Sequence, residues 1–191
     1  MNRQTVIVLA MHGVPPADFP RPELEEFFAI HARLEHAGTT DRHGLERYEE
    51  LETKLRSWPR TEDNDPYHAA SLKLGRALSS AAGSDVFVGF NEFCAPGLDE
   101  TLDRAVATGA GSVLVVTPMM TQGGEHSERD IPAAISRARE RHPGRRIVYA
   151  WPFPVADVAK FLAEQVRQFS SLPGSDTEPP THHEHQAGRT T

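Results

Sequence analysis

Four short, almost uninterrupted apolar runs alternate with segments of helical periodicity, and this alternation limits the folds open to the chain. The runs lie at residues 6–11, 85–90, 112–117 and 147–151. Runs that are apolar at nearly every position are typical of strands covered on both faces, as in parallel sheets. The sequence therefore predicts an α/β fold: a doubly wound, flavodoxin-like parallel sheet of four strands.

Helix boundary signals between the runs support this prediction. Asp65-Pro66 is typical of an N-cap residue followed by proline in the first helical turn, and Gly83 predicts the end of that helix. The apolar spacing of residues 98–106, 131–138 and 155–169 predicts three further helices.

Residues 20–65 interrupt the alternation. They are too many for a plain loop in a compact domain, and they contain two helical patterns, the first opened by Pro22 and stopped by Gly38. We predict an inserted helical hairpin, which serves as structural padding, as a dimer contact or as a lid over a site. The predicted organisation is one α/β domain at residues 1–172 and a disordered, histidine-containing tail at 173–191.

Composition excludes several classes of protein. A chain of 191 residues suits one domain, and its single cysteine, Cys94, excludes an internal disulfide and a multi-cysteine metal site within one chain. A net charge of −7 argues against nucleic acid as a partner. No apolar run approaches the roughly 20 residues that span a bilayer, and the first run is a poor signal peptide. We therefore expect a soluble, cytoplasmic protein without a membrane partner.

Three chemically capable side chains follow three of the runs. His12, with Gly13 after it, follows the first run, Glu92 follows the second and His126 follows the third. Ligands of open parallel sheets bind at the carboxyl ends of the strands, so we expect these side chains to converge in one crevice. Neutral imidazoles bind Co²⁺, Ni²⁺ or Fe²⁺ and accept protons near neutral pH. Asp130, four residues after His126, is placed to orient that imidazole.

Taken singly, these residues also have structural explanations. An isolated histidine is more often bonded to local backbone than to a ligand, and Glu92 alone resembles an ordinary loop carboxylate. Acidic residues around His126 also complement the dipole of a helix N-terminus. Their expected convergence is what favours the functional interpretation.

The motifs around these residues resemble those of the class II tetrapyrrole chelatases, which include sirohydrochlorin cobaltochelatases, nickelochelatases and ferrochelatases. In chain order they are Met11-His12-Gly13, Asn91-Glu92-Phe93-Cys94-Ala95-Pro96, and Gly124-x-His126-x-x-x-Asp130-Ile131-Pro132. The resemblance runs from residue 4 to about residue 170, apart from the insertion. The third motif is its most specific part.

The resemblance implies insertion of a divalent metal, Co²⁺ or else Ni²⁺ or Fe²⁺, into sirohydrochlorin or a related tetrapyrrole, in cobalamin or siroheme biosynthesis. It implies that His12 and His126 bind the metal and remove pyrrole protons, and that Glu92 helps to accept them. It also implies no organic cofactor, since the metal is a substrate, and a homodimer. Val14 stands where many members have a serine, which leaves the identity of the substrate open.

Two other functions compete with this one. A non-catalytic metal storage or delivery protein would use His126 together with the histidines of the tail. A histidine phosphatase also has a histidine and a glycine after a strand, but it needs an arginine where Met11 stands. The sequence does not choose among cobalt, nickel and iron, because imidazole binds all three.

Overall fold

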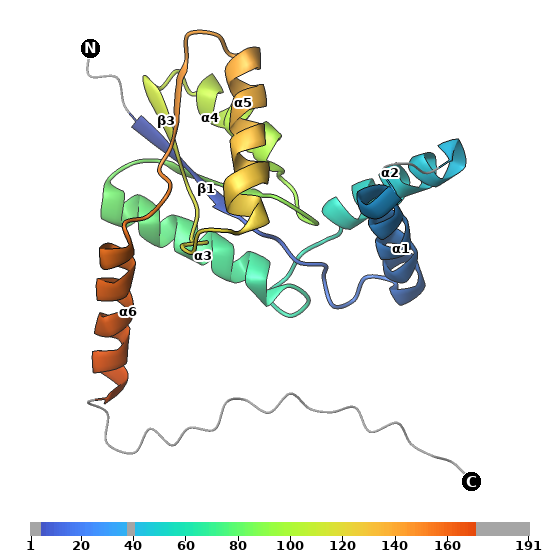
Figure 1. Ribbon diagram of the computed structural model, residues 1–191, viewed down its shortest axis with the longest axis horizontal. Helices are drawn as coiled ribbons and strands as arrows, with labels where there is room; N and C mark the ends of the chain where they lie inside the picture. Colours follow the sequence, from blue (N-terminus) through green and yellow to red (C-terminus); the bar gives the residue numbers. More distant parts are fainter. Residues whose placement is uncertain (1–4, 38–40, 171–191) are drawn as a thin grey trace. The chain divides into compact units, whose positions relative to one another are not determined.

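A computed structural model of the chain describes residues 5–37 and 41–170 (Figure 1). Gly38 and the tail at residues 173–191 lie outside this range, so the predictions made for them are not tested. The elements are, in order, β1 (Thr5–Met11), α1 (Arg21–Ala37), α2 (Arg42–Arg56), α3 (Pro66–Ala82), β2 (Val86–Phe90), α4 (Leu98–Ala107), β3 (Ser112–Val116), the π-helical turn η1 (His126–Asp130), α5 (Ile131–Arg141), β4 (Arg146–Tyr149) and α6 (Val155–Ser170).

The four strands form one parallel sheet in the order β2-β1-β3-β4. This is the flavodoxin-like order predicted from the alternation of strands and helices. It places β1 between β2 and β3, with Met11 opposite Phe90 and Leu9 opposite Val116. The carboxyl ends of the first three strands therefore meet at one edge of the sheet.

Helices cover both faces of the sheet (Figure 1). Val6 and Val8 of β1 point to the face covered by α4 and α5, where they belong to the largest buried cluster. Leu9 and Met11 belong to a second cluster, against which Tyr67 and Leu78 of α3 pack. Because successive side chains of a strand point to opposite faces, burial on both sides explains why the strands are apolar at almost every position.

The segment predicted as a helical hairpin consists of α1 and α2, which share a small core of their own. Its buried members are Phe19, Phe27, Ile30, Leu51 and Leu55. Ion pairs between the two helices, such as Lys54 Nζ to Glu23 Oε2 at 2.6 Å, add to this contact. Leu45 of α2 is exposed, and Trp58 lies beyond the end of that helix.

The chain divides into two compact units, Met1–Pro152 and Phe153–Thr191. The sheet and the hairpin belong to the first unit. The described part of the second unit contains α6, a helix with no buried residue. The expectation of a single domain over residues 1–172 stays a prediction. No helix within the described ranges is long and apolar enough to cross a membrane.

Candidate metal centre

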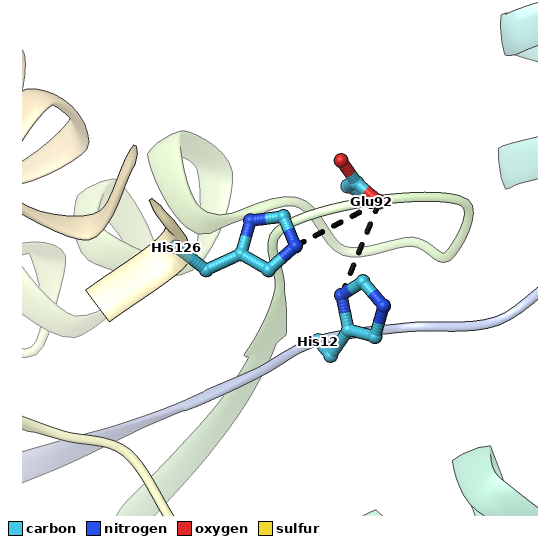
Figure 2. A group of neighbouring side chains, drawn as sticks. All are labelled: His12, Glu92 and His126. Atoms are coloured by element: carbon cyan, nitrogen blue, oxygen red, sulfur yellow. Dashed lines mark ion pairs between the residues drawn. The ribbon is translucent and has the colours of Figure 1, made fainter. Parts of the chain in front are cut away.

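Three side chains meet at the carboxyl edge of the sheet. His12 directly follows β1, Glu92 lies in the loop after β2, and His126 begins η1. One ligand atom from each lies within 4.8 Å of the other two, and Figure 2 shows both imidazoles directed towards the carboxylate. The convergence expected from the strand order is confirmed, whereas the roles of these residues stay predictions.

The donor atoms surround a space instead of bonding to each other. Glu92 Oε2 lies 3.9 Å from His12 Nδ1 and 4.0 Å from His126 Nε2, both too long for hydrogen bonds. Ligand atoms about 2.1 Å from one ion lie roughly 3 to 3.5 Å from each other. The observed separations are slightly wider than this, so a small movement of the side chains would let them share one divalent ion.

A carboxylate orients the imidazole of His126. His126 Nδ1 lies 2.7 Å from Asp130 Oδ2, the contact anticipated from their spacing. When the Nδ1–H group donates to this carboxylate, the lone pair of Nε2 faces Glu92 and is available to a metal. The histidine therefore presents one defined nitrogen to the centre.

His126 and Asp130 bound a π-helical turn, which lies before the helix predicted from the spacing of residues 131–138. Two contacts hold it: the Tyr149 hydroxyl donates to the Ser127 carbonyl at 3.0 Å, and the Gly123 amide donates to a Glu128 carboxylate oxygen at 2.7 Å. Single π-turns often occur at functional sites. Sequence reasoning missed Tyr149, because nothing in β4 marks it as a partner of this turn.

The loops that carry His12 and Glu92 touch each other through their backbones. The Glu92 amide donates to the His12 carbonyl at 3.0 Å. At Gly13, which has φ +102°, an added Cβ atom would lie 2.0 Å from the Glu92 carbonyl oxygen. Only glycine fits such a close approach, which gives the His-Gly pair a physical reason.

Burial shifts the pKa of His12, in the centre, and of Cys94, in the core near it. Burial and the neighbouring His126 lower the pKa of His12 below its usual 6.5, and the opposing effect of the Glu92 charge is smaller. Within the described residues, His12 Nδ1 is buried without a hydrogen-bond partner. Burial also raises the pKa of the Cys94 thiol, and this fully buried side chain belongs to a hydrophobic core cluster.

The inserted hairpin borders the centre. A cavity of about 320 Å³ is lined by Glu92 and Asp130 together with Phe27 and Tyr48 of the hairpin. Arg129 also lines it, but its guanidinium already pairs with the carboxylates of Glu125 and Asp130. These neighbours therefore partly neutralise the charge of Arg129.

Comparisons with known proteins place these residues in context. The model of the CbiX family matches residues 62–169, a range that contains Glu92 and His126 but not His12. The sirohydrochlorin cobaltochelatase of Priestia megaterium is 40% identical over 92 residues, or 46% of this chain and 30% of that protein. The sirohydrochlorin ferrochelatase of the same organism is 27% identical over 80 residues, or 41% of this chain and 30% of that protein.

Two solved structures are also similar. A putative cobalamin biosynthesis CbiX protein from Marinobacter aquaeolei VT8 aligns with a TM-score of 0.46 and 19% identity, over 87% of this chain and 96% of that one. The sirohydrochlorin chelatase SirB from Bacillus subtilis subspecies spizizenii, in complex with cobalt, aligns with a TM-score of 0.44 and 17% identity, over 86% of this chain and 50% of that one.

Proposed function

Because the chain belongs to the CbiX family, we propose that it is a chelatase that inserts Co²⁺, or else Ni²⁺ or Fe²⁺, into sirohydrochlorin or a related tetrapyrrole. Family membership confirms the resemblance to class II chelatases. The chain spans less than a third of the length of the curated relatives that it matches, so its activity and substrate are proposals. The observation that carries them is the convergence of His12, Glu92 and His126.

The first chemical requirement is to take a divalent ion from water and to release it to the macrocycle. Neutral imidazole nitrogens suit Co²⁺, Ni²⁺ and Fe²⁺. The lowered pKa of His12 keeps this imidazole neutral at pH 7, and Asp130 directs Nε2 of His126 to the same space. Three donors from the described residues surround the space, which leaves positions for water or for pyrrole nitrogens.

The second requirement is to remove the two protons that a metal displaces from the pyrrole nitrogens. The Glu92 carboxylate, placed between the two imidazoles, is a suitable acceptor. Either imidazole can take the other proton once the metal has left it. A rigid crevice that favours a distorted macrocycle over a flat one would supply further rate acceleration.

The remaining parts of the proposal concern partners. The metal is a substrate and no organic cofactor takes part, and the product would serve cobalamin or siroheme biosynthesis. We further propose a homodimer, which the exposed apolar side chains of α6 support. A cytoplasmic location and the absence of nucleic-acid and membrane partners stay predictions from the sequence.

The test is an anaerobic absorbance assay with sirohydrochlorin and Co²⁺, Ni²⁺ or Fe²⁺. Insertion should exceed the spontaneous rate and should fall at least about 100-fold in His12→Ala and His126→Ala. His142→Ala is the matched control, because His142 also pairs with a carboxylate, Asp103 at 2.7 Å, but is no part of the centre. It should retain the wild-type rate.

The same assay separates a chelatase from a storage protein. A chelatase keeps its turnover after removal of residues 173–191, whereas a storage protein that uses the tail binds metal without turnover and loses capacity with the tail. No acceleration with any of the three metals would contradict the proposed activity.

A further inference from the structure

Arg60 lies between the inserted hairpin and α3, and it is one of the most buried charges in the described chain. Its side chain is only 6% exposed and pairs with the carboxylate of Asp65, which is fully buried. This buried ion pair lies outside the group formed by His12, Glu92 and His126. What this pair contacts indicates its role.

The guanidinium of Arg60 joins three segments of the chain. Nη1 donates to the carbonyl oxygen of Val14 at 2.7 Å, just after the His12-Gly13 pair. Nη2 donates to the carbonyl oxygen of Phe93, next to Glu92, and to that of Leu55, in the last turn of α2, at 2.9 Å. One side chain thus connects both site-bearing loops to the hairpin.

Asp65 fixes the direction of the guanidinium. One of its oxygens accepts from the His68 amide at 2.8 Å and caps α3, while the other accepts from Arg60. The carboxylate is therefore anchored to a helix, and the planar fork of arginine carries this orientation to the two loop carbonyls. Arginine alone among cationic side chains has two terminal nitrogens that can do so.

Two details suggest that the bonds to the loops impose a conformation on them. Phe93 has φ +56°, a left-handed conformation that is uncommon for residues other than glycine, and its carbonyl is one that Arg60 holds. In addition, Arg60 Nε is buried and has no hydrogen-bond partner within the described residues. The side chain leaves one donor unsatisfied while its two terminal nitrogens satisfy the loops.

We propose that Arg60 is a positioning residue that sets the separation of His12 and Glu92, so that the inserted hairpin is part of the scaffold of the metal centre. The inference rests on the proposed function, because it assumes that His12, Glu92 and His126 bind the metal. Among the described residues, Arg60 makes no hydrogen bond or ion pair with these three side chains, and it acts through the backbones of Val14 and Phe93.

The test uses the full-length protein without tetrapyrrole. Co²⁺ is titrated into wild type and Arg60→Lys, and the visible ligand-field bands of the bound ion are recorded, because they report its coordination geometry. Lysine keeps the charge beside Asp65 but cannot reach both carbonyls. We expect Arg60→Lys to bind Co²⁺ about 10- to 100-fold more weakly, with altered bands, as for other residues that orient ligands.

The matched control is Arg47→Lys. Arg47 also belongs to the hairpin, but its ion-pair partners among the described residues, Glu26 and Glu50, lie on the hairpin itself. This variant should keep the wild-type affinity and bands. Circular dichroism at the assay temperature verifies that each variant is folded. If Arg60→Lys is unfolded, Asp65→Asn serves instead, since asparagine can still cap α3.

The outcomes separate the two proposals. Wild-type affinity and bands in folded Arg60→Lys, or in Asp65→Asn where that variant is used, overturn the positioning role and leave the chelatase proposal intact. If His12→Ala binds Co²⁺ as wild type does, His12 is not a ligand of the ion. That result would contradict the proposed function, and with it the basis of the positioning role.

Discussion

His12 and His126 differ in what surrounds each imidazole. His126 has a carboxylate partner on Nδ1, whereas Nδ1 of His12 is buried and, among the described residues, has no hydrogen-bond partner. Burial then favours the uncharged form of His12, and the nearby His126 acts in the same direction. The two histidines are therefore suited to different tasks: His126 is oriented, and His12 is kept neutral.

This difference can be measured by NMR titration of the ring protons of His12. The pKa of His12 should lie below 6.5 in the wild type. Glu92→Gln should lower it further, because the Glu92 charge raises it, and His126→Ala should increase it, because His126 lowers it. Shifts in the same direction in both variants would contradict the electrostatic account.

The pKa of His12 also has a consequence for stability. Because the folded state holds the proton of His12 less tightly than the unfolded state, the contribution of His12 to the free energy of unfolding is present above pH 6.5. It decreases as the pH falls through that value towards the lower pKa of the folded state.

At the scale of elements, the centre depends on how closely the loops after β1 and β2 approach each other. Gly13 permits this approach, since an added Cβ atom would clash with the Glu92 carbonyl. We expect Gly13→Ala to lower the free energy of unfolding by about 2 to 4 kcal/mol, through steric overlap and backbone strain together. Urea unfolding gives the value.

Gly109→Ala is the control for this prediction. Gly109 also has a positive φ, +79°, but an added Cβ atom there meets nothing within 4 Å. Gly109→Ala should lower the free energy of unfolding by only about 1 kcal/mol, from backbone strain alone. Equal losses in the two variants would mean that the contact with Glu92 adds nothing.

The residues at helix boundaries predicted the start and the end of α3, but they did not predict the π-helical turn η1. Asp65 caps α3, as its position before Pro66 indicated, and Gly83 ends that helix in a left-handed conformation. The π-turn at His126 was not predicted, because its carbonyl at Ser127 is held by Tyr149 from β4. Capping residues indicate hydrogen bonds between neighbours in the sequence, whereas the bond from Tyr149 to Ser127 joins two separate elements.

At the scale of the whole molecule, α6 has no buried residue although its sequence is amphipathic. Its exposed apolar side chains are Val155, Phe161, Leu162, Val166 and Phe169. If α6 contributes to a contact between two copies, light scattering should find a dimer, and Leu162→Glu should shift the protein towards monomer. A specific interface of about 1,200 Å² or more would be required.

Lys160→Glu provides the control, because it changes charge on the same helix at a polar position. It should leave the dimer intact. A monomeric wild-type protein would contradict the homodimer. If Leu162→Glu remains a dimer, the contact between the two copies does not depend on this face of α6.

The sequence by itself determined the layered α/β architecture and the inserted hairpin. It also determined that His12, Glu92 and His126 converge at one edge of the sheet. It could do so because apolar periodicity and strand-ending positions are local properties, and parallel strands bring their carboxyl ends together. Only the tertiary structure decided that Arg60 joins both loops, that Tyr149 holds the turn of His126 and that the hairpin borders the centre. These contacts connect segments far apart in the chain, and no spacing along a sequence specifies which distant carbonyl a side chain will reach.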